Sequence, residues 1–94
     1  MFTYVALMKL TPEGREGLKE APKHLEKIKR LVEEQRGELV ETFAMMGPWD
    51  FFAIVKYPAV EAAFKAHAKI AALDVLEVET CPVEEVELFI KALV

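Results

Sequence analysis

The residues expected to form β-strands are apolar on both sides of the chain, and this feature restricts the fold more than any other. Alternate residues of a strand point to opposite faces of a sheet. One alternating set is almost purely apolar and is expected to lie beneath helices: Tyr4, Ala6, Met8, Val40, Ala44, Met46, Ala53, Val55, Leu76 and Val78. The opposite set has an apolar centre inside a charged fringe: Val5, Leu7, Phe43, Met45, Phe52 and Ile54. An exposed apolar patch of that size marks an interface, so the sequence predicts that this face packs against a second copy of the chain.

Turn and capping residues divide the chain into a β-α-β-β-α-β order followed by a terminal helix. We expect strands over four ranges: 2–10, 38–46, 50–57 and 74–81. A helical pattern begins after the N-cap residue Thr11, is interrupted at Pro22 and ends at Arg36, with Gly37 as its C-terminal cap. The second helix is expected over 59–73, with an apolar stripe of Val60, Ala63, Phe64, His67 and Ala71. Pro82 opens a short terminal helix.

This order predicts an α+β fold, a ferredoxin-like β-α-β-β-α-β sandwich with an extra C-terminal helix. With two sheets stacked face to face, the assembly would be a dimeric α/β barrel. The length of 94 residues allows one domain spanning 1–94.

Composition and charge exclude several classes of partner. The net charge is −4, and lysines alternate with glutamates along the first helix, so we expect no nucleic-acid partner. No apolar run approaches the ~20 residues needed to cross a bilayer. The lone Cys81 and an opening strand without a leader pattern predict a cytoplasmic protein. The absence of Asn and Ser, with Glu and Lys dominating the charged residues, is typical of a thermophilic source.

Several short motifs resemble the GYD domain family over almost the whole chain. They are Thr3-Tyr4-Val5, Lys9-Leu10-Thr11-Pro12-Glu13-Gly14, Ala21-Pro22 with Leu25-Glu26, Gly37-Glu38-Leu39 and Gly47-Pro48-Trp49-Asp50-Phe51. Trp49 stands at the tyrosine position of the family's Gly-x-Tyr-Asp turn, so an aromatic ring is kept and a phenol hydroxyl is lost. The resemblance implies a dimeric α/β barrel and no particular activity.

His67 is the most informative polar residue because it interrupts the apolar stripe of the second helix. It is either a packed histidine with one nitrogen bonded to the backbone, or a ligand-binding or acid–base group in a cavity between helix and sheet. His24 lies on an exposed lysine–glutamate face. Two distant histidines without nearby Cys or acidic ligands make no metal motif, so we expect neither a metal nor a cofactor.

A catalytic role is disfavoured for three residues of the fourth predicted strand: Glu77, Glu79 and Cys81. The two glutamates point the same way from an edge strand, where charges guard against unwanted pairing. Cys81 has no base near it in sequence, and the absence of serine excludes a serine hydrolase triad.

Trp49 and Asp50 lie in a turn where an exposed indole would be costly. Trp49 is expected to pack against a partner or a helix, and Asp50 to cap the turn backbone. The candidate ligand-binding residues are therefore Tyr4, Met8, Trp49, Asp50 and His67. The candidate interface residues are Val5, Leu7, Phe43, Phe52 and Ile54.

Two functions from different classes fit these observations. The first is a small homodimeric α/β-barrel module that binds a small hydrophobic metabolite. The alternative is a cofactor-independent, monooxygenase-like enzyme acting on a hydrophobic compound. A cavity of roughly 300 Å³ or more beneath the second helix would favour a binder or an enzyme over a purely structural module. The sequence leaves open the ligand, the activity and any assembly beyond a dimer.

Overall fold

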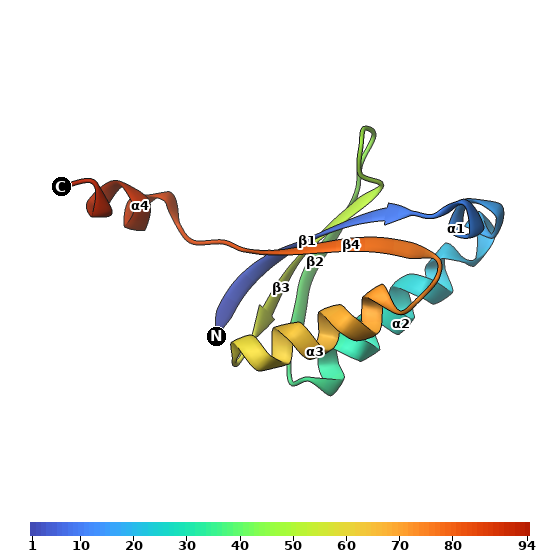
Figure 1. The fold of residues 1–94 in the computed structure, drawn as a ribbon, viewed down its shortest axis with the longest axis horizontal. Coiled ribbons are helices and arrows are strands. Elements are labelled where there is room, and N and C mark those ends of the chain that lie inside the picture. Colours follow the sequence, from blue (N-terminus) through green and yellow to red (C-terminus); the bar gives the residue numbers. More distant parts are fainter.

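The computed structural model describes all 94 residues, and its elements follow the predicted order (Figure 1). The strands are β1 (Phe2–Leu10), β2 (Glu38–Ala44), β3 (Phe51–Tyr57) and β4 (Leu76–Pro82). The helices are α1 (Pro12–Glu16), the single 3-10 turn η1 (Leu18–Glu20), α2 (Ala21–Glu34), α3 (Val60–Ala71) and α4 (Val86–Ala92). No helix is both long enough and apolar enough to cross a membrane.

The four strands form one antiparallel sheet in the order β2-β3-β1-β4. This is the strand order of the ferredoxin-like plan, because the two central strands are those that begin each β-α-β half. The sheet is open, with β2 and β4 as its edge strands. The predicted α+β class is therefore confirmed, whereas the barrel stays a prediction about two chains.

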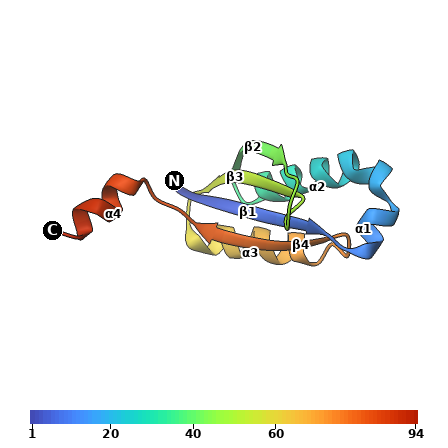
Figure 2. The same cartoon turned by 90° about the horizontal axis from the view of Figure 1, so that it is seen from above.

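Both α2 and α3 cover the same face of the sheet, and no element covers the other (Figures 1 and 2). The core lies between this face and the two helices, and it consists of 13 buried residues. They are Tyr4, Ala6, Met8, Leu10, Ile28, Val32, Ala53, Val55, Tyr57, Ala63, Ala66, Ile70 and Leu76. Most of the core residues that come from the sheet are alternate residues of β1 and β3, as the period of two in a strand predicts.

The prediction that Val40 faces the helices is wrong, because β2 contains an irregularity at that residue. Leu39 pairs with Val55 and Glu41 pairs with Ile54, so Val40 is an extra residue in the ladder. One extra residue reverses the face to which the following side chains point. Leu39 therefore takes the helix-facing place, and Val40 is exposed on the edge strand.

The apolar stripe of α3 is rotated relative to the prediction. Ala63, Ala66 and Ile70 are its buried residues. Phe64, which we expected on the stripe, is 70% exposed, and Val60 is also exposed. A spacing of three or four residues fits more than one helix face, so the sequence could not decide which of two neighbouring faces touches the sheet.

The first helical region begins and breaks as predicted. Thr11 is the N-cap of α1, and its side chain accepts a hydrogen bond from the N–H of Gly14. The chain then passes through η1 into α2, in which Pro22 occupies the first turn. Pro22 therefore marks the start of α2, where its missing N–H has no consequence.

The end of α2 differs from the prediction that Gly37 caps it. Arg36 takes the left-handed conformation, with φ of 59°. A Cβ atom on Gly37 would lie 2.7 Å from the ring of Tyr57 and 2.9 Å from Val32. Glycine is needed there because β2 passes close to the core, not because of its backbone angles.

Helix α4 leaves the sheet beyond the end of β4 and packs against nothing in its own chain (Figures 1 and 2). The radius of gyration is 14.1 Å, compared with about 12 Å for a compact domain of this length. The extra size comes from this projecting arm.

Candidate functional site

The candidate site is a cavity between the first half of α3 and the sheet. Its volume is about 280 Å³, close to the lower end of the about 300–1,000 Å³ range of ligand cavities. Seven residues line it: Tyr4 of β1; Val60, Ala63, Phe64 and His67 of α3; and Thr80 and Pro82 of β4. Ala63 presents only a methyl group to the cavity, which leaves this space between α3 and the sheet unfilled.

The polar centre of the cavity is a pair formed by His67 and Thr80. The Nδ1 atom of His67 lies 2.8 Å from the Oγ1 atom of Thr80, within hydrogen-bond distance. This bond fixes the imidazole ring between α3 and β4. Because Nδ1 is engaged, Nε2 is the ring nitrogen that remains to bind a ligand.

Two of the five candidate ligand-binding residues meet in this cavity. Tyr4 and His67 both line it, although they are far apart in sequence. Met8 does not line it, because its side chain is 1% exposed and lies inside the core. Met8 follows Tyr4 by four residues on the same strand face, so it lies ~13 Å from Tyr4 along the strand.

Thr80 is a polar residue of the cavity lining that was not among the predicted candidates. It pairs with Ala6 across β1 and β4, and it faces the helices two residues before Pro82. Its position on the same strand face as Leu76 and Val78 was the available signal, since a hydroxyl in that apolar series requires a partner.

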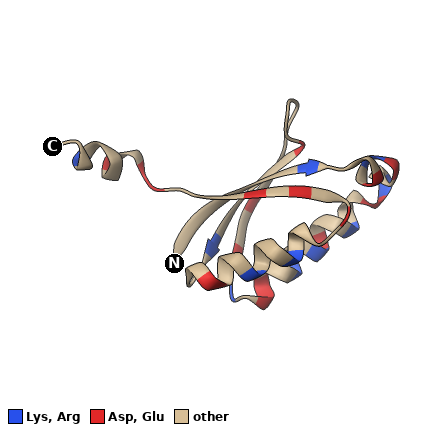
Figure 3. Ribbon diagram, in the orientation of Figure 1, with Lys and Arg blue, Asp and Glu red and all other residues tan.

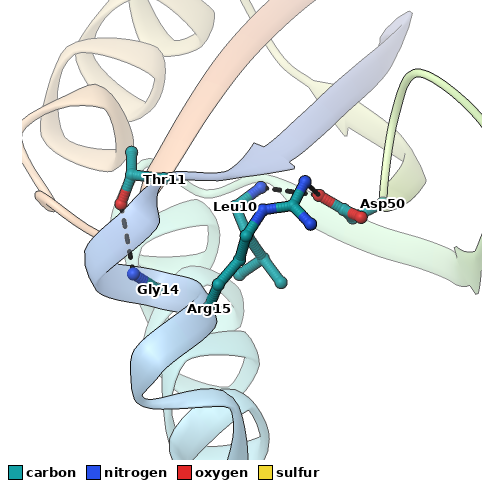
Figure 4. Close-up of polar contacts among 5 residues, drawn as sticks. All are labelled: Leu10, Thr11, Gly14, Arg15 and Asp50. Carbon is teal, nitrogen blue, oxygen red and sulfur yellow. Dashed lines mark hydrogen bonds and ion pairs between the residues drawn. The ribbon is translucent and has the colours of Figure 1, made fainter.

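Asp50 was predicted to cap the backbone of its own turn, but its side chain instead bonds to the last residue of β1, at the end of the strand away from the cavity (Figure 4). Its Oδ2 atom accepts a hydrogen bond of 2.8 Å from the N–H of Leu10 and lies 3.6 Å from the Arg15 guanidinium. The backbone of Asp50 also bonds to Met8 and Met45. Asp50 therefore attaches the β2–β3 loop to the end of β1, and the half-buried Trp49 precedes it in that loop. Neither residue lines the cavity.

The five candidate interface residues lie together on the uncovered face of the sheet. Leu7 pairs with Phe52, which pairs with Phe43, and the two phenylalanine rings stack with centroids 4.7 Å apart. Val5 and Ile54 form the adjacent row. The remaining side chains of this face, including Lys9, Lys56, Glu77 and Glu79, surround the apolar centre. We call this surface the open face.

Tyr57 is an ionisable side chain inside the core. Burial raises the pKa of Tyr57 to about 12, and the proximity of Tyr4 adds to the effect. The two rings meet edge to face, with centroids 5.7 Å apart. Tyr57 is therefore a neutral core residue at physiological pH, and it stands directly behind the cavity wall that Tyr4 forms.

A larger hollow of about 590 Å³ lies where α4 leaves the sheet. Thr3 and Val83 line one side of it, and Glu84, Glu85, Glu87, Leu88 and Lys91 line the other. These residues are exposed except for the half-buried Thr3, so the hollow is a gap between the arm and the sheet. No group of three or more His, Cys, Asp or Glu side chains in the chain could hold a metal ion.

Two of the solved structures that share this fold illustrate the similarity. A homoserine dehydrogenase from Thiobacillus denitrificans matches 88% of this chain with a TM-score of 0.63 and 19% identity, and this chain spans 17% of that one. TTHA0845 from Thermus thermophilus matches 90% of this chain and 95% of its own, with a TM-score of 0.59 and 20% identity. At these identities the likeness shows the fold alone.

Sequence comparison assigns the chain to a family. No curated protein sequence matches it. The GYD domain profile matches residues 4–93, nearly the whole chain and every motif noted above from Tyr4 onward. The chain therefore belongs to the GYD domain family.

Proposed function

We propose that this protein is a homodimeric module that binds a small apolar molecule in the cavity beneath α3. The observation that carries the proposal is an apolar cavity that contains one oriented histidine. Its lining is mainly apolar, and three of its residues, Tyr4, His67 and Thr80, carry polar groups. Ligand sites typically combine an apolar lining with a few placed polar groups.

The lining indicates the chemistry of the ligand. A flat or compact apolar molecule would fit against Phe64 and Tyr4, and a single donor or acceptor group would reach Nε2 of His67. A charged ligand is disfavoured, because no lysine, arginine or carboxylate lines the cavity. The same lack of a carboxylate leaves His67 without an acidic partner for general acid–base chemistry, which favours binding over catalysis.

The dimer in this proposal forms through the open face. Val5, Leu7, Phe43, Phe52 and Ile54 are adjacent there, and no helix covers them. Stacking two such faces would bury both apolar centres and close an eight-stranded α/β barrel. Self-association would remove the exposed apolar side chains of the open face from water, and it requires no protein other than a second copy of the chain.

Ligand binding is tested by filling the cavity. Ala63 is buried and lines the cavity, so Ala63→Leu would occupy the space that a ligand needs. The matched control is Ala68→Leu on the exposed face of the same helix. Indole, which is flat and apolar and carries one N–H group, serves as the probe. We expect indole to shift the amide NMR signals of Phe64, His67 and Thr80 in the native chain and the control, and not in Ala63→Leu. Equal shifts in Ala63→Leu would contradict the proposed site.

The dimer is tested separately by charge insertion. Leu7→Glu would place a carboxylate in the centre of the stacked faces, where it has no partner. Ala68→Glu adds the same charge on an outer helix face. Light scattering at micromolar concentration should give twice the chain mass for the native protein and Ala68→Glu, and the single-chain mass for Leu7→Glu. A native protein of single-chain mass would refute the dimer.

A further inference from the structure

The projecting arm is the feature that the proposed function leaves without a role. Helix α4 has seven residues and no buried side chain. Its apolar stripe consists of Val86, Phe89, Ile90 and Leu93, each more than half exposed. An isolated helix shorter than about 12 residues is unstable in water. An amphipathic helix this short therefore requires a surface on which to pack.

We infer that α4 of one subunit packs on the outer edge of the partner's β2, around the bulged residue Val40. This inference rests on the proposed homodimer and adds a second contact to it. Val40, like Phe43, is an exposed apolar residue of the edge strand β2, and edge strands that remain uncovered invite unwanted pairing.

Strand directions place the arm at the correct end of the sheet. Two identical faces that stack on each other are related by a two-fold axis lying between them. If this axis runs along the strands, β4 of one subunit lies opposite β2 of the other. Because β4 is antiparallel to β1, β1 to β3, and β3 to β2, the end of β4 coincides with the beginning of β2 at Glu38. The arm then leaves beside the partner's Val40.

Charge decides between this axis and the alternative. An axis running across the strands would set β4 against the partner's β4, bringing Glu77 and Glu79 of one subunit against the same residues of the other. Like charges that face each other between strands are destabilising. The axis along the strands instead sets Glu79 near the level of the apolar residue Phe43, because both lie in the row that contains Leu7 and Phe52.

The arm begins with acidic residues, and its proposed receiving surface carries basic residues together with Glu38 and Glu41 of β2 (Figure 3). Glu84, Glu85 and Glu87 lie in or next to the start of α4, and none of them forms an ion pair in the chain. Near the start of β2, Arg36 and Lys56 are likewise without an ion pair. Lys56 pairs in register with Glu38 at the first position of β2. Docking on the partner subunit would bring the three glutamates at the start of α4 close to the partner's Arg36 and the partner's Lys56.

The open face is limited in area, and a second contact would extend it. Four strands spaced about 4.8 Å apart and about seven residues long give a flat footprint of about 440 Å². A stable interface of standard size buries about 800 Å² of accessible surface on each partner, a measure that exceeds the flat footprint of the same patch. The two arms, which are related by the two-fold axis, would enlarge the interface equally on both sides.

Cross-linking between introduced thiols tests the docked arm in the full-length chain. In a Cys81→Ser background, Val40→Cys is combined with Ile90→Cys and treated with a short bis-maleimide. The control combines Ile90→Cys with Ala68→Cys on the outer face of α3, and each single-cysteine variant is treated in parallel. We expect a product of twice the chain mass to be at least about five times more abundant for the variant carrying Val40→Cys and Ile90→Cys than for any control.

Each other outcome has a defined meaning. An intramolecular cross-link, seen as loss of both thiols at single-chain mass, would show that the arm folds onto its own subunit and would overturn the inference. No cross-link, in a protein that light scattering shows to be a dimer, would overturn the arm contact and leave the proposed dimer intact. A single-chain mass in light scattering would refute the dimer and the arm contact together.

Discussion

His67 on α3 and Thr80 on β4 are joined by a hydrogen bond of 2.8 Å between Nδ1 and Oγ1. This bond links the helix that roofs the cavity to the edge strand that forms its floor. The bond leaves Nε2 of the ring free. Because the bond holds the ring, the orientation of the imidazole depends on a residue thirteen positions away in sequence.

Removing either partner should change binding more than folding. Thr80→Val keeps the shape of the side chain and removes the hydroxyl, so His67 loses its orientation. Because a typical hydrogen bond contributes about 1 kcal/mol, we expect indole to bind about fivefold more weakly. Thr80→Ser should retain native affinity. His67→Leu should abolish the contact while leaving the melting temperature unchanged or raised, since an apolar side chain replaces a half-buried polar one. NMR titration and thermal unfolding measure the two effects, and unchanged affinity in both Thr80→Val and His67→Leu would remove these residues from the site.

Asp50 should matter for stability through Leu10 and not through Arg15. Asp50→Ala leaves the half-buried N–H of Leu10 without its acceptor, and we expect the free energy of unfolding to fall by about 1–2 kcal/mol. Arg15→Ala should cost less than about 0.5 kcal/mol, because the ion pair is long and its arginine is exposed. Urea denaturation of the two variants makes the comparison. Equal losses would show that the ion pair, not the hydrogen bond, fastens the loop.

Two glycines of the first helical region should respond differently to substitution by alanine. A Cβ atom on Gly14 would collide with the carbonyl oxygen of Val75, which accepts a hydrogen bond from Thr11 and cannot move freely. Gly14→Ala should therefore destabilise the protein by about 1–3 kcal/mol, despite the higher helix propensity of alanine. Gly17→Ala meets its nearest atom at 3.7 Å and should be close to neutral. Thermal unfolding distinguishes them, and a stable Gly14→Ala variant would show that α1 can shift away from Val75.

Tyr57 should make the fold sensitive to high pH. Its pKa is raised from 10.0 to about 12 in the folded chain. Between these values the unfolded chain has lost the phenol proton and the folded chain retains it. The stabilisation is therefore complete below about pH 10 and is lost as the pH rises to about 12, a change of about 2–3 kcal/mol.

Tyr57→Phe should remove this part of the alkaline destabilisation. The Tyr57 hydroxyl makes no side-chain hydrogen bond within the chain, so the variant should differ little from the native protein at pH 7. Urea denaturation from pH 8 to 12 should show the native protein losing more stability than Tyr57→Phe. Parallel curves would assign the alkaline effect to other groups.

The local features of the chain were predictable from its sequence because they depend on neighbouring residues. Thr11 and Pro12 start α1, Pro22 sets the start of α2, and the period of two in β1 and β3 separates the core from the open face. The order of these elements was sufficient for the ferredoxin-like plan, and the five residues predicted for the interface lie on one face. That Tyr4 and His67 line one cavity agrees with the same plan, since α3 covers the sheet face on which Tyr4 lies.

Only the tertiary structure decided the details that depend on contacts between distant residues. The bulge at Val40 arises from pairing with β3, and no local signal marks it. The rotation of α3 that exposes Phe64 is set by packing of Ala63 and Ala66 on the sheet. The separation of the proposed ligand site from Trp49 and Asp50 reflects the length of β1, which holds Tyr4 and Leu10 at opposite ends. Thr80 gained its role because β4 passes beneath His67, a contact that strand order and helix rotation produce together.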